Sequence, residues 1–307
     1  MQQGMYHVPV LLEEAIAGLN IISSGTYVDC TFGGGGHSAA ILKKLDSNGK
    51  LIAFDQDADA RENLPPDSRL IFIPNNFRHL QRFLRLHKIA EVNGLLADLG
   101  VSSHQFDVAE RGFSTRYNAP MDMRMNQHEN LDAAKVISTY NEEHLHKIFE
   151  EYGEVTNAKT LAKTIVLLRK SQSLKTINEF KAALYPIVKG NPEKYFAKVF
   201  QALRIEVNDE LGALKEMLLQ VPGILAEGGR AVFITFHSLE DRIVKNFFRY
   251  GNFEEQKNED DLYGLPQKND LKLITKKPIT PSTHEIKINA RARSSKLRIA
   301  EKKKVSE

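Results

Sequence analysis

A run of four glycines near the start of the chain is the first feature that could do chemistry. It lies within Thr31–His37, which reads TFGGGGH, after a short apolar run and before an amphipathic stretch. The pattern predicts a glycine-rich turn between a strand and a helix. Such a turn suits a nucleotide-type ligand, because glycines let the backbone approach it closely. A dinucleotide site needs G-x-G-x-x-G, whereas here His37 stands where a third glycine is expected, so the fit to a pyrophosphate is poor.

Two carboxylates and an aromatic ring follow the next three expected strands. Asp55, Phe77 and Asp98 stand at the ends of these strands, at the edge where an open α/β sheet binds its ligand. An ionised Asp55 can accept hydrogen bonds from both hydroxyls of a ribose, and Phe77 offers a face for adenine. The combination favours S-adenosylmethionine, which carries a ribose and an adenine but no phosphate. Without a ligand, Asp55 is a turn former or helix cap, Phe77 is core, and the glycines make a tight turn.

The elements that must position these residues alternate between strand and helix. Apolar runs predict parallel strands at Thr26–Cys30, Leu51–Phe54, Leu70–Ile73 and Gly94–Ala97. Amphipathic stretches after the first and third of these predict crossover helices. The expected fold class is therefore α/β, with a parallel, Rossmann-type sheet and right-handed crossovers.

The alternation of predicted strands and helices ends after the fourth strand. The next expected strand, Arg230–Phe236, follows about 130 residues later, which is far too long for a crossover. The interval shows helical periodicity at Leu131–Tyr140, Glu142–Tyr152, Asn157–Lys170, Thr176–Leu184 and Lys194–Leu219. We expect an all-helical domain at residues 111–214, inserted into an α/β domain made of residues 1–110 and 215–307. A helix and two late strands should complete the sheet domain, at Leu239–Tyr250, Leu271–Thr275 and Glu285–Ile288.

Composition excludes several classes of protein. The 307 residues are 42% hydrophobic and 26% charged, which rules out global disorder. No run approaches the ~18 apolar residues of a membrane span, and Glu13 and Glu14 interrupt the first apolar stretch, which argues against a secretory signal. The single cysteine, Cys30, can form neither an internal disulfide nor a thiolate zinc cluster, so we expect a cytoplasmic protein. The net charge of +3 is too small to indicate nucleic acid by itself.

Five segments together resemble one bacterial family. They are TFGGGGHS at Thr31–Ser38, DLGVSS at Asp98–Ser103, AERGFS at Ala109–Ser114, FHSLEDRIV at Phe236–Val244 and ARSSKLRIA at Ala292–Ala300. From His7 to Ala300 the chain resembles the small-subunit ribosomal RNA cytosine-N4 methyltransferases of the MraW/RsmH type.

This resemblance implies a Rossmann-type domain with a helical insertion and S-adenosylmethionine as the cofactor. It implies methylation of the exocyclic N4 of a cytidine in the decoding region of 16S rRNA. The implied substrate is small-subunit rRNA, either naked or in the assembled subunit, and neither a membrane nor DNA is an expected partner. The implied cofactor contacts are Gly34, Gly35, Gly36, His37, Asp55, Phe77, Asp98 and Gln105.

Methylation of this amine sets demands on the site. The lone pair of N4 is delocalised into the ring, so the enzyme must hold the amine in line with the sulfonium methyl. An acceptor near N4 helps by taking up its proton, and we expect Asp98 in this role unless it is a helix N-cap. His237, at the end of the fifth strand, binds RNA, relays a proton or is structural. Cys30 is expected to pack rather than attack the ring. His144 and His146 are expected on a solvated face, and no metal is expected.

Four polar residues are candidates for RNA contacts. Arg204 and Asn208, four residues apart, share one face of a predicted helix and either bind RNA or form an intrahelical pair. Arg291 and Arg293 open a basic C-terminal stretch, and their guanidinium groups suit phosphate. From charge alone this stretch is a solvated tail. The family resemblance favours RNA binding, with the expected strand Glu285–Ile288 as its anchor.

Other functions fit parts of the pattern. An NAD(P)-dependent oxidoreductase would use the same scaffold, but the contiguous glycines speak against it. A ribosome-assembly protein that performs no chemistry would keep the same motifs, and only a turnover assay separates it from an enzyme. A methyltransferase for a small molecule or a protein is disfavoured by an insert large enough to clamp a macromolecule. The sequence predicts an rRNA methyltransferase that transfers the methyl group directly to nitrogen.

Overall fold

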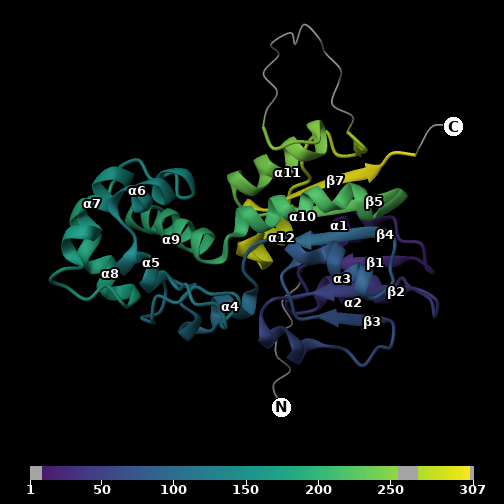
Figure 1. The fold of residues 1–307 in the computed structure, drawn as a ribbon, viewed down its shortest axis with the longest axis horizontal. Coiled ribbons are helices and arrows are strands. Elements are labelled where there is room, and N and C mark those ends of the chain that lie inside the picture. Colours follow the sequence, from purple (N-terminus) through teal and green to yellow (C-terminus); the bar gives the residue numbers. More distant parts are fainter. Residues whose placement is uncertain (1–8, 255–268, 305–307) are drawn as a thin grey trace, which may run out of the picture. The chain divides into compact units, whose positions relative to one another are not determined.

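The chain folds into two compact units. The computed structural model describes residues 9–254 and 269–304. One unit, here called the sheet unit, consists of Met1–Gly100 and Leu211–Glu307, and the other, the helical unit, is Val101–Glu210. Figure 1 shows that the named strands belong to the sheet unit. No helix in the described ranges has both the length and the apolar character needed to cross a membrane.

The sheet unit is built on a seven-stranded sheet. Its spatial order is β3 (Leu70–Ile73), β2 (Lys50–Phe54), β1 (Thr26–Asp29), β4 (Val92–Asp98), β5 (Leu225–Thr235), β7 (Lys296–Lys302) and β6 (Leu271–Leu273). The first five strands pair in parallel, and β7 runs antiparallel to both β5 and β6. A dinucleotide-binding sheet has the order 3-2-1-4-5-6. The reversed β7, placed between β5 and β6, therefore distinguishes this sheet from that type.

Helices cover both faces of the sheet. Side chains alternate along each strand, so Val28 and Leu95 contribute to the core on one face. Their neighbours Tyr27 and Leu96 contribute to the core on the other. The first face packs against α3 (Leu80–Leu86), α10 (Glu210–Ile224) and α11 (Ser238–Tyr250). The second packs against α1 (Leu12–Leu19) and α2 (Gly36–Leu42). This three-layer arrangement confirms the predicted α/β, Rossmann-type fold class.

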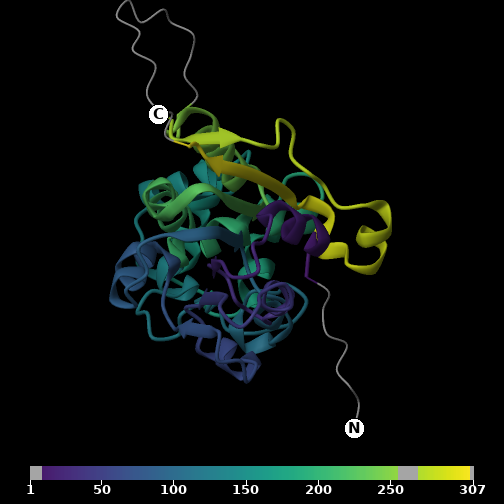
Figure 2. The same cartoon turned by 90° about the vertical axis from the view of Figure 1, so that its right-hand side faces the viewer.

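One of the late strands was predicted wrongly. Glu285–Ile288 belongs to a helix, α12 (Thr283–Ile288). The Ser282 hydroxyl caps this helix by accepting a hydrogen bond from the Glu285 backbone N–H at 3.1 Å. The Glu285 carboxylate in turn accepts a hydrogen bond from the Leu11 backbone N–H at 2.8 Å. Figure 2 shows the yellow C-terminal segment beside purple α1, in agreement with this contact.

The basic C-terminal stretch is folded as far as the structure describes it. It begins with a 3-10 turn, η5 (Ala290–Ser294), and continues as the inner strand β7. Arg298 is buried in β7 and donates to the Asp241 carboxylate of α11 at 2.7 and 3.1 Å. Lys296 reaches the same carboxylate at 3.1 Å. The solvated-tail interpretation is therefore wrong for residues 291–302.

The helical unit has its own hydrophobic core. Its helices are α4 (Ser103–Asp107), α5 (Ala133–Thr139), α6 (Glu142–Glu151), α7 (Ala158–Leu168), α8 (Ile177–Leu184) and α9 (Pro192–Asn208). Phe180 and Phe200 meet edge to face in this core, with ring centroids 5.8 Å apart. The single helix expected at Lys194–Leu219 is wrong, because Asp209 adopts a left-handed φ of 46° and separates α9 from α10. That this unit recognises the substrate stays a prediction.

Candidate active site at the glycine-rich turn

The glycine-rich turn joins β1 to α2. Its middle, at Gly34, faces open space, whereas its end, at Gly36, is covered by Pro9. Gly33 has φ 48° and Gly35 has φ 74°, in the left-handed region that glycine tolerates. A Cβ on Gly34 would meet nothing within 4 Å. A Cβ on Gly36 would come within 2.2 Å of the Pro9 ring. The turn therefore leaves room for a ligand at Gly34, while Pro9 packs against it at Gly36.

Asp29, the last residue of β1, holds both ends of the turn. Its Oδ1 accepts a hydrogen bond from the Thr31 N–H at 3.0 Å, and its Oδ2 accepts one from the Ser38 hydroxyl at 2.7 Å. The side chain is fully buried, and burial raises its pKa. Asp29 was not among the predicted site residues, although an acidic side chain at the end of a strand, two residues before a glycine-rich turn, is a readable signal.

Asp55 lies directly after β2 and fixes the start of the turn. Its Oδ2 accepts a hydrogen bond from the Gly33 N–H at 2.7 Å, and its Oδ1 accepts one from the Asp57 N–H at 2.9 Å. Burial raises the pKa of Asp55 to about 6, and the nearby carboxylates of Asp57 and Asp29 add to this effect. Asp55 thus shapes the turn, as one interpretation expected. Its contact with a ribose stays a prediction.

Asp98 ends β4 next to the same turn. Its backbone N–H donates to the Thr31 hydroxyl at 2.7 Å, which ties the end of β4 to the turn. Within the described residues, its buried Oδ1 has no hydrogen-bond partner. Burial raises the pKa of Asp98 well above its ordinary value, and the charges of Asp29 and Glu240 add to this. The N-cap interpretation is wrong, because Ser102 caps the helix that follows.

His37 lies in α2 with its ring buried beside Asp98. Its Nε2 is 3.2 Å from the Val10 carbonyl oxygen. Because a carbonyl can only accept, Nε2 carries the hydrogen in this contact. Nδ1 lies 3.7 Å from Asp98 Oδ2. Burial lowers the pKa of His37, which favours the neutral ring.

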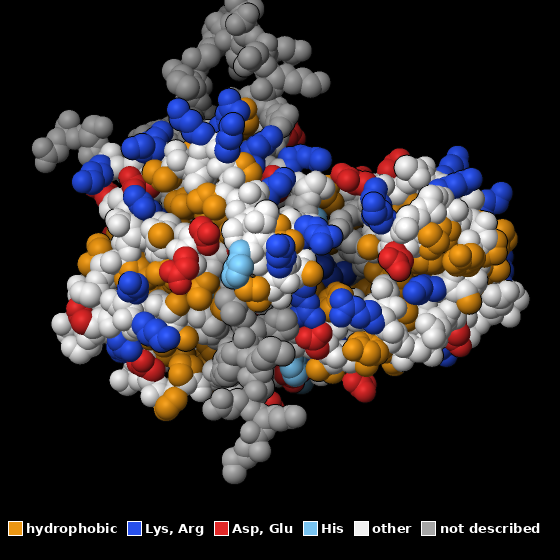
Figure 3. All heavy atoms as spheres, turned by 180° about the vertical axis from the view of Figure 1, so that it is seen from behind, with side chains coloured by type: hydrophobic (Ala, Val, Ile, Leu, Met, Phe, Trp, Pro, Cys, Tyr) orange, Lys and Arg blue, Asp and Glu red, His pale blue; other side chains and the backbone are white. Residues whose placement is uncertain are grey.

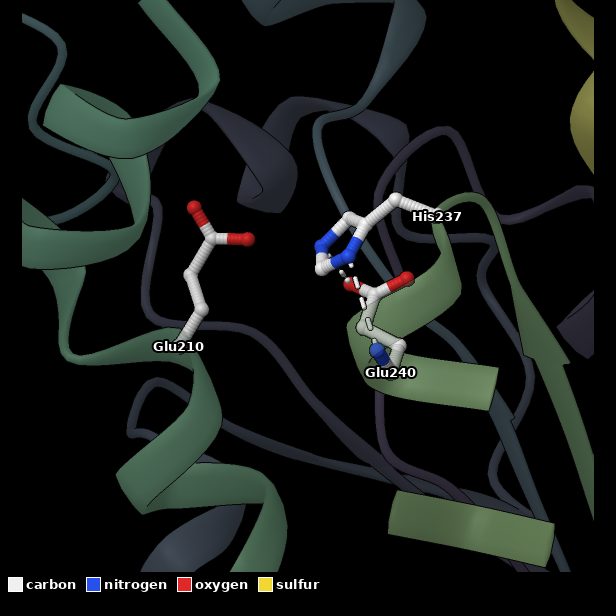
Figure 4. Close-up of side chains that lie close together, drawn as sticks. All are labelled: Glu210, His237 and Glu240. Atoms are coloured by element: carbon white, nitrogen blue, oxygen red, sulfur yellow. Dashed lines mark hydrogen bonds and ion pairs between the residues drawn. The ribbon is translucent and has the colours of Figure 1, made fainter. Parts of the chain in front are cut away.

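His237 and Glu240 support each other at the start of α11 (Figure 4). His237 caps the helix, with its Nδ1 accepting from the Glu240 N–H at 3.4 Å, and its Nε2 lies 3.2 Å from Glu240 Oε1. The other oxygen of the buried Glu240 accepts from the Phe236 N–H at 2.8 Å. These contacts support the structural interpretation of His237, and its catalytic role stays a prediction. Glu240 was missed, although an acidic residue three positions after a helix cap is a recognisable capping pattern.

Two further cofactor candidates have local structural roles. Phe77 begins the 3-10 turn η2 (Phe77–His79) and is half-buried against the core beneath α3. Gln105 is buried in α4, where its amide oxygen accepts from the Ser102 N–H at 3.0 Å and its own backbone N–H donates to the Ser102 hydroxyl at 3.1 Å. This capping box positions the amide side chain of Gln105. The expected contacts of both residues with the cofactor stay predictions.

Arg204 and Asn208 make contacts inside the helical unit. The Arg204 guanidinium donates to both oxygens of Glu210, at 2.8 and 3.0 Å. The Asn208 amide accepts from the Met125 N–H at 2.7 Å and donates to the Met123 carbonyl at 2.8 Å. The Asn208 amide also donates to the Arg204 carbonyl at 2.9 Å, in agreement with the intrahelical alternative. Their role in RNA binding stays a prediction.

Arg291 and Arg293 lie in η5 and differ in exposure. Arg293 is exposed, whereas Arg291 is half-buried and donates its backbone N–H to Asn289 Oδ1 at 3.1 Å. Figure 3 shows Lys and Arg side chains on the face seen from behind, gathered most densely at its upper edge. Arg293 is thus accessible to a phosphate, but its contact with RNA stays a prediction.

Three carboxylates converge on the glycine-rich turn, of which Asp29 is buried and Asp55 and Asp98 are half-buried. Asp29, Asp55 and Asp98 end or follow β1, β2 and β4, and none has a Lys or Arg partner in the part of the chain that the structure describes. Their raised pKa values mean that a cation nearby would stabilise their ionised forms. The same carboxylates would repel the negative charge of a pyrophosphate. Fold and site together define a Rossmann-type α/β protein whose open glycine-rich turn is surrounded by carboxylates and suits a cationic ligand.

Comparison with known proteins identifies the family. The chain belongs to the MraW methylase family, whose model matches residues 4–303. It is 53% identical over 299 residues to "Ribosomal RNA small subunit methyltransferase H" of Bacteroides thetaiotaomicron, covering 97% of this chain and 98% of that protein. It is also 53% identical over 304 residues to the protein of the same name in Flavobacterium johnsoniae, with 97% and 98% covered. These findings confirm the family resemblance expected from the sequence motifs.

Proposed function

We propose that the protein methylates small-subunit ribosomal RNA, with S-adenosylmethionine as the methyl donor. Membership in a methylase family and the names of the two relatives support this proposal. The observation that carries it is the group of three carboxylates, Asp29, Asp55 and Asp98, around the open glycine-rich turn. S-adenosylmethionine carries a positive sulfonium and a ribose, which complement that group. NAD(P) would bring a negative pyrophosphate instead.

The residues around the turn fit this cofactor. Gly34 leaves open space for the amino-acid end of the cofactor. Asp55 would accept the ribose hydroxyls, and half-buried Phe77 would contact adenine. When bound, the cofactor supplies an electrophilic methyl group on its sulfonium. The chain's own task is to hold the acceptor amine in line with that methyl group and to take up its proton.

The finer proposal is direct transfer to the exocyclic N4 of a cytidine in the decoding region. Asp98 is the group that accepts a hydrogen bond from this amine, because it has a buried oxygen without a partner among the described residues. Covalent attack on the ring would need an activated thiolate. Cys30 is buried in the core and burial raises the pKa of its thiol well above the ordinary value. An inert thiol supports direct transfer to nitrogen.

Two measurements test this proposal. Calorimetric titration should show binding of S-adenosylmethionine and none of NADH. Purified small ribosomal subunits, and naked small-subunit rRNA in parallel, are then incubated with the protein and methyl-labelled S-adenosylmethionine. Label in the rRNA is the expected result. Binding of NADH alone would point to an oxidoreductase, and cofactor binding without transfer would point to a ribosome-assembly protein that performs no chemistry.

A further inference from the structure

Two polar side chains beside the glycine-rich turn face each other without a hydrogen bond. His37 Nδ1 and Asp98 Oδ2 are 3.7 Å apart, and both groups are largely withdrawn from solvent. The far nitrogen of the ring, Nε2, is held by the Val10 carbonyl at 3.2 Å. Because Nε2 keeps its hydrogen, a neutral His37 presents the lone pair of Nδ1 to the carboxyl group of Asp98.

This arrangement favours a proton on the pair. A lone pair and a carboxylate oxygen that face each other repel unless one of them carries a hydrogen. The groups around the pair are negative as well. Asp29 of β1 acts on both His37 and Asp98, and Glu240 of α11 acts on Asp98. Two nearby groups can become cationic: His37, which faces Asp98, and His237, whose Nε2 lies 3.2 Å from Glu240 Oε1.

We propose that His37 is a positioning residue for methyl transfer, which acts by letting the His37–Asp98 pair take up the proton released from the acceptor amine. This inference rests on the proposed function. The bond that forms joins N4 to the methyl carbon, and the bond that breaks joins that carbon to sulfur, which keeps the electron pair. The N4 proton moves to the Asp98 carboxyl group as the hydrogen already there moves to His37 Nδ1, a transfer that requires the 3.7 Å between Asp98 Oδ2 and Nδ1 to shorten to hydrogen-bond distance. The resulting imidazolium keeps its Nε2 hydrogen on the Val10 carbonyl.

The competing explanation is that His37 only holds the Pro9–Leu11 segment against the turn. The variant His37→Gln separates the two, because a glutamine side chain can still donate to the Val10 carbonyl but has no basic nitrogen to protonate. His87→Gln is the matched control, since His87 is an exposed histidine at the end of α3. Thermal unfolding of each variant checks that it is folded. If His37→Gln does not fold, His37→Asn takes its place.

The measurement is the single-turnover rate of methyl transfer to small-subunit rRNA, at saturating S-adenosylmethionine and over a range of pH. At pH 7 we expect His37→Gln to lower this rate by about ten- to hundredfold. Because His37 is itself an expected cofactor contact, calorimetry measures the cofactor affinity of each protein separately, and each rate is taken at a concentration that saturates that protein. The acidic limb of the profile should move to higher pH. In the variant, Asp98 can accept the N4 proton only when it is ionised, so activity is lost as soon as Asp98 is protonated. In the wild type, a protonated Asp98 can still pass its hydrogen to His37, so activity persists to lower pH.

Two results would overturn the inference. One is a wild-type rate in His37→Gln, and the other is a rate lowered by the same factor at every pH. A double variant with Asp98→Asn adds a further check, because the effect of His37→Gln should vanish once Asp98 is gone. A wild-type protein that binds S-adenosylmethionine but transfers no methyl group to rRNA would refute the proposed function instead, so the two failures are distinguishable.

Discussion

Replacing Asp55 by alanine is expected to weaken the binding of S-adenosylmethionine by about 1.5–3 kcal/mol. That is on the order of a tenfold to hundredfold loss of affinity. The cost has two sources in the structure. The ribose hydroxyls lose a charged acceptor, and the backbone N–H groups of Gly33 and Asp57 lose the carboxylate that they share, at 2.7 and 2.9 Å. In Asp55→Ala the turn is therefore less ordered in the free protein, and the cost of ordering it reduces the affinity for the cofactor.

The same residue makes a pH dependence predictable. Only the ionised carboxylate accepts both hydroxyl hydrogens, and the pKa of Asp55 in the free protein is about 6. Affinity should therefore be fully developed above this pKa and should fall as the pH drops through it. Between pH 7 and pH 5 the ionised fraction falls from about nine-tenths to about one-tenth, so the wild-type Kd should rise about tenfold.

Isothermal calorimetry at pH 5, 6, 7 and 8 measures both effects. Asp55→Ala keeps any pH dependence that Asp98 contributes, so the difference between the two proteins isolates Asp55. Glu62→Ala, which removes an exposed carboxylate from the neighbouring 3-10 turn η1 (Ala58–Asn63), is the control and should bind as the wild type does. Wild-type affinity in Asp55→Ala would contradict this role of Asp55, as would a wild-type affinity that is flat or rises from pH 7 to pH 5.

Three further predictions concern the other candidate residues. Asp98→Asn should lower the methylation rate more than it weakens cofactor binding, and equal losses in kcat and in calorimetric affinity would leave Asp98 as a cofactor ligand only. Asn208→Ala removes the hydrogen bonds to the loop at Met123 and Met125, so urea denaturation should show a loss of about 1–3 kcal/mol in unfolding free energy; an unchanged midpoint would show that the amide does not hold this loop. Arg291→Ala with Arg293→Ala should weaken RNA binding and reduce the slope of log K against log salt by about 0.7–0.9 per lost phosphate contact. A wild-type slope would show that neither arginine contacts phosphate.

The parallel strands could be predicted because their signals are local. β1 to β4 are short apolar runs that end in polar or glycine-rich turns, and burial on both faces makes such runs continuous rather than alternating. The glycine-rich turn and the carboxylates after β2 and β4 follow from the same pattern. Because parallel strands align their carboxyl ends, Asp55 and Asp98 had to lie at one edge of the sheet.

The C-terminal elements could not be predicted as easily, because their patterns are ambiguous. Glu285–Ile288 alternates like a strand, but the cap at Ser282 and the contact of Glu285 with Leu11 favour a helix. β7 also alternates, yet its basic residues suggested a tail. Arg298 can be buried there only because Asp241, 57 residues earlier in the chain, neutralises it. A pairing over that distance leaves no local signal.

The contacts of the candidate site lay beyond sequence reasoning for a similar reason. Nothing near His37 in the sequence shows that Val10 holds its ring or that Asp98 faces it. The end of α9 at Asp209 could not be predicted either. The apolar pattern of α9 continues into α10, and a left-handed φ is uncommon at a residue other than glycine.

Mass spectrometry of nucleosides from small-subunit rRNA tests the central claim most directly. The rRNA is taken from cells with the gene, without it, and with the gene restored either as wild type or as Asp98→Asn. We predict that N4-methylated cytidine, derived from one decoding-region position, is lost without the gene and returns with the wild type but not with Asp98→Asn. An unchanged nucleoside profile, or loss of a methyl group from any other base, would contradict the proposed methylation of N4.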